Sequence, residues 1–272
     1  MKKITLPEKI TVSDLKDNRY RVVIEPFYPG FGVTVGNSLR RALLSSLTGA
    51  AVTAFKIEGA KHEFDSVDFV KEDLVEIMLN LKKLRLKCFS EEPVKLFLEA
   101  KGEKEVTAAD IKKNSAVTIV NTDLLIATLT DKKAKLNMEI TVENGIGYLT
   151  VEQRNEKGKL EIGNIAIDSS FSPVLNVGYN MENVRVGEMT NYERLTMDIL
   201  TDGTTDAQAA IRQAALLLKE QFDFFGQQNE RSAETERSAV EVSPAETAPD
   251  KPEEKKKASK KDSEEKKTKK SK

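Results

Sequence analysis

The amino-acid sequence predicts an α+β fold, in which a mostly β body carries a few helices and ends in a disordered, charged tail. Short runs such as 94–100 and 136–142 alternate apolar and polar residues, as strands with one buried face do. Three longer segments repeat their apolar residues with the period of a helix. Residues 227–272 contain no Leu, Ile, Met, Phe or Tyr, so they bury too little apolar surface to fold.

Turn-forming residues separate the predicted strands, for example at Pro29-Gly30, Asn144-Gly145 and Asp202-Gly203. Between such turns we expect strands at 20–24, 51–57, 94–100, 116–120, 136–142, 146–151, 160–167, 182–187 and 195–199. No repeat of fixed length is visible, so the strands are not those of a solenoid.

The first predicted helix covers residues 37–47. Asn37 is suited to cap its start, and Gly49 is suited to end it. Its apolar stripe consists of Leu39, Leu43 and Leu47, with Leu44 beside it. Arg40 and Arg41 are adjacent on this helix and point about 100° apart, so they cannot share one face. From the residues alone two interpretations stay open: one arginine presents its guanidinium group to a partner, or both lie in solvent around the leucines.

The second predicted helix covers about 71–84. The third covers about 206–225, where the run 205–208 (TDAQ) has the pattern of a capping box. The apolar residues of the third helix are Ile211, Ala215, Leu218, Phe222 and Phe225, with Leu217 and Phe224 on a second stripe. One face can pack on a sheet, and the other then needs a partner, most simply a second copy of the chain. The alternative is a helix that is buried entirely in its own domain.

The composition excludes several classes of protein. The 43 Lys and Arg residues nearly balance the 44 Asp and Glu residues, which does not indicate a strongly basic nucleic-acid binder. The single Cys88 excludes a disulfide framework and a cysteine zinc site, and the single His62 excludes a multi-histidine metal centre. No apolar run is long enough to cross a membrane, and the first residues do not resemble a signal peptide, so we expect a cytoplasmic protein.

The sequence contains no recognisable catalytic motif. It lacks a Walker-type phosphate loop, a Gly-x-Gly-x-x-Gly motif and an Asp-x-Asp pair for two-metal chemistry. The best carboxylate pair is Glu72 and Glu76, one helical turn apart, and we expect both side chains to face solvent. We therefore predict no catalytic residue, no cofactor and no metal site.

One run is similar to a known family signature. The run from Glu25 to Ser46 (EPFYPGFGVTVGNSLRRALLSS) closely resembles the signature of bacterial RNA polymerase α subunits. Further matching blocks follow in the same order: His62-Glu63-Phe64, Leu79-Asn80-Leu81-Lys82, Val106-Thr107-Ala108-Ala109-Asp110, Ser172-Pro173-Val174, Tyr192-Glu193-Arg194-Leu195 and Thr201-Asp202-Gly203-Thr204. The resemblance covers about residues 1–226.

The resemblance implies two subdomains, a dimerisation domain at 1–48 plus 174–226 and an insert at 49–173. It implies a homodimer in which the helices at 37–47 and 206–225 pair across a two-fold axis. The dimerisation residues would then be Leu39, Leu43, Leu47, Ile211, Leu218, Phe222 and Phe225. The dimer would be the platform on which β and then β′ assemble, with omega and sigma joining the complex. It would be a non-catalytic subunit of DNA-directed RNA polymerase, a nucleotidyltransferase of the cytoplasm and nucleoid.

The resemblance also assigns docking residues. Arg41 aligns with the arginine implicated in docking β, and Leu44 aligns with a neighbouring position. Arg40 lies beside them and is included in this predicted surface. Lys82 and Ile167 align with positions implicated in contact with β or β′, although the family often has Val where this chain has Ile167.

The C-terminal segment departs from the family pattern. Typical α subunits carry a compact helical domain there that binds promoter DNA and activators, and the residues of 227–272 cannot form one. Residues 251–272 carry 11 positive and 5 negative side chains, which suggests non-specific, salt-sensitive contact with DNA phosphates. We favour the alternative of a solubilising tail, since the interspersed carboxylates weaken the field. A rival hypothesis is a self-standing dimeric binding module whose tail is the functional part.

Overall fold

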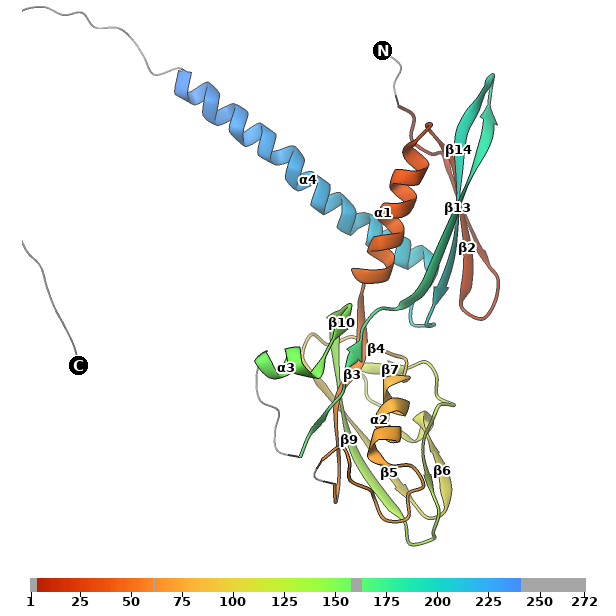
Figure 1. The fold of residues 1–272 in the computed structure, drawn as a ribbon, viewed down its shortest axis with the longest axis vertical. Coiled ribbons are helices and arrows are strands. Elements are labelled where there is room, and N and C mark those ends of the chain that lie inside the picture. Colours follow the sequence, from red (N-terminus) through yellow and green to blue (C-terminus); the bar gives the residue numbers. More distant parts are fainter. Residues whose placement is uncertain (1–3, 61, 158–162, 241–272) are drawn as a thin grey trace, which may run out of the picture. The chain divides into compact units, whose positions relative to one another are not determined.

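The computed structural model describes residues 4–60, 62–157 and 163–240 (Figure 1). The chain forms mostly strands with a few helices between them, which confirms the predicted α+β fold. The chain divides into two compact units, Met1–Phe224 and Phe225–Lys272. Residues 251–272, for which contact with DNA and a solubilising role were the two alternatives, lie outside the described residues.

The first sheet is antiparallel, with the strand order β1-β2-β14-β13. Its strands are β1 (Lys9–Asp14), β2 (Arg19–Phe27), β13 (Val174–Val186) and β14 (Met189–Thr201). Helix α1 (Phe31–Ser45) packs on β13 and β14, and α4 (Ala207–Val240) contributes small buried residues, such as Ala210 and Ala214, to the same core. This core combines segments from both ends of the first unit.

The second sheet has the strand order β11-β3-β9-β5 and is also antiparallel. Its strands are β3 (Thr48–Ile57), β5 (Val94–Lys101), β9 (Lys135–Ile146) and β11 (Ile165–Ala166). Three two-stranded sheets accompany it: β4 (Leu86–Cys88) with β7 (Val117–Ile119), β6 (Lys104–Thr107) with β8 (Leu125–Leu129), and β10 (Tyr148–Leu149) with β12 (Ser169–Ser170). The helices of this region are α2 (Leu74–Lys82), the short 3₁₀ helix η1 (Ala108–Asp110) and α3 (Val151–Lys157).

Two hydrophobic cores form within the described residues, and they share no side chain. The first contains Val22, Leu43 and Leu195, and the second runs along the chain from Val52 to Ile167. Each core is built by one sheet and its own helices. The domain boundaries expected at 48/49 and 173/174 stay a prediction.

Helix α1 begins six residues earlier than predicted. Its N-cap is Gly30, in the left-handed region with φ 85°, and not Asn37, which lies inside the helix. It ends at Ser45, so Leu47 lies beyond it, although Leu47 is buried. The sequence pattern misplaced the start because the group that satisfies the first amides of α1 comes from a distant strand.

Several predicted strands also differ from the structure. The segment 146–151 is not one strand: β9 ends at Ile146, β10 covers only two residues, and Val151 begins α3. Of the strand predicted at 160–167, residues 158–162 lie outside the described part of the chain, and β11 covers Ile165–Ala166. The exposed strand β1 was not predicted, because its pairing with β2 rather than its own burial keeps it extended.

Helix α4 starts and ends differently from the prediction. Its cap is Asp206, whose Oδ1 accepts from the Ala209 amide at 2.7 Å, so the capping residue lies one position after the expected Thr205. The structure continues the helix to Val240, through part of the segment predicted to be disordered. Residues 227–240 are rich in Gln, Glu, Arg and Ala and contain no proline, so their local helix propensity is high.

Candidate subunit-docking surfaces

The adjacent arginines of α1 have different surroundings. Arg40 is half-buried, and its Nε donates to the carbonyl oxygen of Val177 on β13 at 3.0 Å. Arg41, about 100° further around the helix, is exposed. The contact with β13 thus fixes one arginine against the sheet and leaves the other at the surface.

Leu44 lies one turn from Arg40 and is half-buried at the edge of the first core. Its carbonyl oxygen accepts from Ser172 Oγ at 3.1 Å, which ties the end of α1 to the segment before β13. Leu44 and Arg41 therefore occupy neighbouring positions near the C-terminal end of α1, as the predicted docking surface requires.

The predicted dimerisation residues divide into two groups. Leu39, Leu43 and Leu47 are 6%, 0% and 1% exposed and pack in the chain's own core, which differs from the expected position on a face between two copies. Their hydrophobic stripe is used to hold α1 on its sheet. A role in dimerisation stays a prediction for them.

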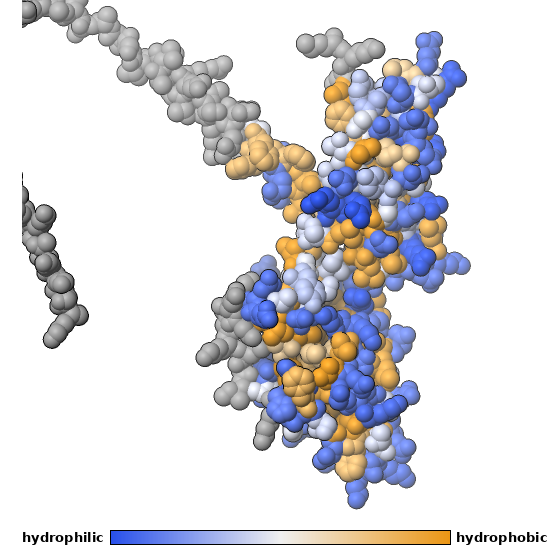
Figure 2. Space-filling view, in the orientation of Figure 1, coloured by the Kyte–Doolittle hydropathy of each residue, from blue (hydrophilic) through white to orange (hydrophobic). Residues whose placement is uncertain are grey.

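The residues of the second group lie on α4 and become more exposed along the helix. Ile211 and Leu218 are half-buried, whereas Phe222 and Phe225 are 64% and 68% exposed. Figure 2 shows apolar atoms along the stretch of α4 that leads to the grey part of the chain. Exposed apolar residues grouped on one helix typically mark an interaction surface.

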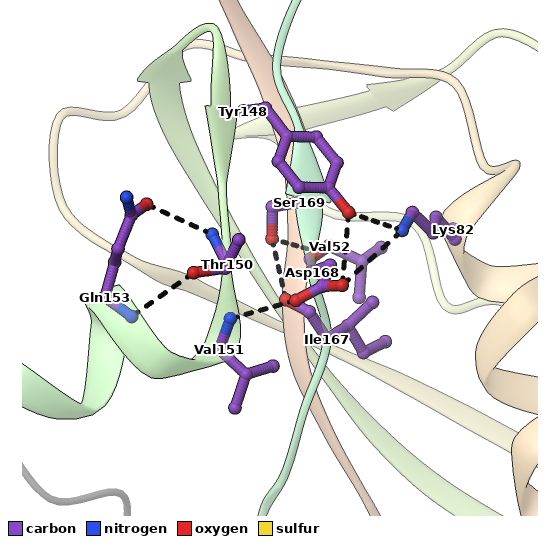
Figure 3. Close-up of polar contacts among 9 residues, drawn as sticks. All are labelled: Val52, Lys82, Tyr148, Thr150, Val151, Gln153, Ile167, Asp168 and Ser169. Carbon is purple, nitrogen blue, oxygen red and sulfur yellow. Dashed lines mark hydrogen bonds and ion pairs between the residues drawn. The ribbon is translucent and has the colours of Figure 1, made fainter.

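Lys82 belongs to a polar network in the second region (Figure 3). Its Nζ donates to the hydroxyl of Tyr148 at 3.0 Å and lies 3.9 Å from Oδ2 of Asp168. The Tyr148 hydroxyl in turn donates to the same Asp168 oxygen at 3.1 Å, and the Val151 amide donates to the other oxygen at 2.9 Å. The network joins the end of α2 to β10, the start of α3 and the segment before β12.

This network contributes little to stability but orders the surface. The side chains of Lys82 and Asp168 are 34% and 41% exposed, and ion pairs so close to solvent stabilise a fold by roughly 0–1 kcal/mol. Tyr148 is half exposed, and the Lys82 amine lies over its ring, 5.1 Å from the ring centroid. A partner would meet side chains that are already ordered, which lowers the entropy lost on binding.

A shallow groove of about 350 Å³ adjoins this network. Its lining includes Phe64, Met78, Leu79 and Lys82, and Phe64 and Leu79 are 80% and 49% exposed. Ile167 also borders the groove but is only 1% exposed, and its side chain packs in the second core. The side chain of Ile167 thus supports the groove from within, and its role in docking stays a prediction.

The expectation that Glu72 and Glu76 both face solvent is correct for Glu76 and wrong for Glu72. Glu76 is exposed, but the carboxylate of Glu72 accepts from the Thr128 amide at 2.6 Å and from its hydroxyl at 2.8 Å. These bonds fasten the segment before α2 to β8. Within the described part of the chain, no group of three or more His, Cys, Asp and Glu side chains could hold a metal ion. None of the helices described is long and apolar enough to cross a membrane.

Phe64, Tyr148 and Asp168 were not among the predicted site residues. Phe64 lies in the matching block His62-Glu63-Phe64, and Asp168 follows Ile167, so both were close to residues that were selected. Tyr148 carries no local signal, because β10 pairs with β12 from a later part of the chain and this pairing brings its hydroxyl to Asp168.

Residues 55–172, which include most of the second sheet, match the family described as RNA polymerase Rpb3/RpoA insert domain. A DNA-directed RNA polymerase subunit alpha from Carboxydothermus hydrogenoformans is 47% identical over 228 residues, which cover 84% of this chain and 72% of the relative.

Two further relatives carry the same name. The one from Aquifex aeolicus is 46% identical over 80% of this chain and 68% of its own length, and the one from Symbiobacterium thermophilum is 49% identical over 80% and 69%. The chain therefore belongs to the family of DNA-directed RNA polymerase alpha subunits, as the sequence resemblance indicated.

Proposed function

We propose that this chain forms a homodimer that serves as the assembly platform of a cytoplasmic RNA polymerase. The dimer binds β and then β′, before omega and sigma complete the complex, and contributes no catalytic residue of its own. One observation carries the proposal. Arg40 is hydrogen-bonded to β13, whereas the neighbouring Arg41 is exposed and available to a partner protein.

The apolar surface of α4 supports the homodimer. Phe222 and Phe225 are more than half exposed although each is a large apolar side chain. A second copy of the same helix supplies a matching surface, and closed two-fold dimers are the commonest symmetric assemblies. Burial of such side chains stabilises an interface by about 1.5–3 kcal/mol each.

The surface around Arg41 suits a large protein partner. An arginine on a fixed helix can donate two parallel hydrogen bonds to a carboxylate or to backbone carbonyl groups, and Leu44 adds an apolar contact beside it. Arginine is among the residues that dominate binding energy at the centres of interfaces. We assign this surface to β.

The surface around Lys82 suits a second contact with β or β′. Phe64 and Leu79 provide apolar contact area at a shallow groove, and the ordered network of Lys82, Tyr148 and Asp168 provides a polar border. An apolar centre with a polar border is the usual anatomy of a protein interface.

The test is the mass of complexes formed by the purified chain and its cognate large subunits, measured by light scattering after size exclusion. We expect two copies per β, and a ternary complex when β′ is added. Arg41→Ala should abolish the complex with β while the homodimer persists. Lys82→Ala should weaken the complex in whichever step uses that surface, by about tenfold.

Matched controls use exposed residues of the same kind outside the proposed surfaces. Arg19→Ala, at the start of β2, and Lys83→Ala, next to Lys82, should leave both assembly steps unchanged. A homodimer that binds β equally well with Arg41→Ala would contradict the proposed docking surface. A chain that is monomeric at micromolar concentration would contradict the platform itself.

A further inference from the structure

An acidic side chain lies at the N-terminal end of the apolar row that β14 turns toward its core. Along this strand Leu195, Met197 and Ile199 alternate inward and are 0%, 0% and 2% exposed. The next inward position in the same direction is Glu193, which is half-buried. A carboxylate in such a place is costly unless hydrogen bonds replace its water.

Glu193 meets this requirement at the start of α1. Its Oε1 accepts from the Gly30 amide at 2.9 Å, and its Oε2 accepts from the Gly32 amide at 2.9 Å. The first amides of a helix have no partner within the helix and carry partial positive charge, so a carboxylate that bridges two of them forms charge-assisted bonds.

Helix α1 does not provide this group itself. All of its residues are described, and its N-cap is a glycine without a side-chain hydrogen bond, while its first turn contains no acidic residue. The cap therefore comes from a residue 161 positions beyond Gly32. A cap from a distant strand constrains more than the helix end, because it also joins the helix to that strand.

Two positions of α1 have no room for a side chain between the helix and the sheet. A side chain at position 32 would place its Cβ 2.7 Å from Glu193 Oε2 and 2.2 Å from Met181 Cε, and one at position 36 would meet Leu195 at 2.8 Å. Glycine at both positions lets α1 lie directly against β14. The pairing of β14 with β2 shifts register between Glu193 and Leu195, so the local irregularity lies where the carboxylate meets the helix.

We propose that Glu193 is a positioning residue for the docking of β: by anchoring the first amides of α1 to β14, it fixes the axial position and rotation of the helix that presents Arg41. Arg41 lies 11 residues beyond Gly30, about 16 Å along the helix axis, so a small rotation or tilt at the start displaces its guanidinium group. This inference rests on the proposed function of Arg41.

The competing explanation is that Glu193 only stabilises α1 electrostatically. By that explanation, a negative charge anywhere in the first turn of α1 can replace Glu193. If Glu193 positions the helix, the replacement must also be bonded to β14. Val33 is the third residue of α1 and is 49% exposed, so Val33→Glu adds a carboxylate to the first turn without a link to the strand.

The experiment measures β affinity and thermal unfolding for the full-length dimer carrying Glu193→Gln, alone and combined with Val33→Glu. Glutamine keeps one oxygen that can accept from one of the two glycine amides. Its NH₂ group would face the other amide, so one of the two hydrogen bonds is lost. We expect Glu193→Gln to preserve the dimer, to lower Tm and to raise the Kd for β about tenfold, and we expect Val33→Glu to restore Tm but not the affinity. Glu188→Gln, an exposed acid in the β13–β14 turn, and Val33→Glu alone should leave the affinity unchanged.

Each outcome distinguishes the explanations. If the double variant regains both Tm and β affinity, or if Glu193→Gln lowers Tm without changing the affinity of the folded dimer, the positioning role is wrong. Arg41→Ala is measured in parallel. If it weakens β binding and Glu193→Gln does not, this inference alone fails, and if Arg41→Ala has no effect, the proposed docking function fails and the inference fails with it.

Discussion

Helices α1 and α2 carry the two proposed docking surfaces, and they are capped in opposite ways. The cap of α2 is local: Asp73 immediately precedes the helix, and its Oδ1 accepts from the Glu76 amide at 2.7 Å. The cap of α1 is supplied by Glu193, from a strand far along the chain. The first arrangement can form as soon as the local chain folds, whereas the second exists only after β14 has joined its sheet.

The same difference holds for the two cores. The second core is built from one continuous part of the chain, from Val52 to Ile167, and the first core combines segments before and after it. The region that presents Lys82 is thus complete within one stretch of sequence. The region that presents Arg41 depends on residues that are distant in sequence and, by our proposal, on a second copy of the chain.

The largest expected effect separates the two cores. Leu43→Ala, under α1, and Ile77→Ala, under α2, each remove a fully buried side chain and should cost about 3 kcal/mol. Amide hydrogen exchange read by mass spectrometry should accelerate only in the core that carries the substitution. If either variant accelerated exchange in both cores, the two cores would open as one unit, which would contradict the proposed difference between them.

The next effect concerns the second copy. Phe222→Asp places a charge on the apolar surface of α4 and should weaken the homodimer about 100-fold, or about 2.8 kcal/mol. Sedimentation velocity over a dilution series measures this change. Phe97→Asp is the matched control, because Phe97 is 47% exposed on β5 and lies in the region that closes its own core. Equal dimer dissociation by both variants would exclude α4 as the specific interface.

The smallest effect tests the local cap. Asp73→Ala removes the side chain that caps α2 and should lower the stability of the second region by about 1 kcal/mol. Urea denaturation followed by circular dichroism measures the loss. The affinity for β should stay unchanged, in contrast to the effect expected of Glu193→Gln. A loss of β affinity with Asp73→Ala would mean that the two helices are coupled.

The sequence predicted those features that depend on short-range pattern. The alternation at 94–100 and 136–142 corresponds to β5 and to part of β9, and the helical period at 71–84 and 206–225 corresponds to α2 and the first part of α4. The boundaries were less accurate, because a helix end is fixed by whichever group satisfies its first amides. For α2 that group is adjacent in sequence, and for α1 it is not.

In the candidate site, too, local sequence patterns were predictive and contacts between distant segments were not. The signature run and its later blocks indicated the family, and the comparisons confirmed it. Ile167 was selected from the resemblance, but its burial could not be known before β11, β3 and α2 were placed around it. The roles of Tyr148 and Asp168 were equally hidden, since the hydrogen bond between them joins residues 20 positions apart across a two-strand pairing.

By itself, the sequence determined the fold class, the family, the strands and helices with the clearest periodicity, and the presence of adjacent arginines on one helix. These depend on periodicity and on residue identity, which are local properties of a chain. Only the tertiary structure decided which arginine is exposed, which leucines pack in the chain's own core, and where α1 begins. Each of these depends on a hydrogen bond or a contact between segments distant in sequence, and such contacts exist only once the sheets have formed.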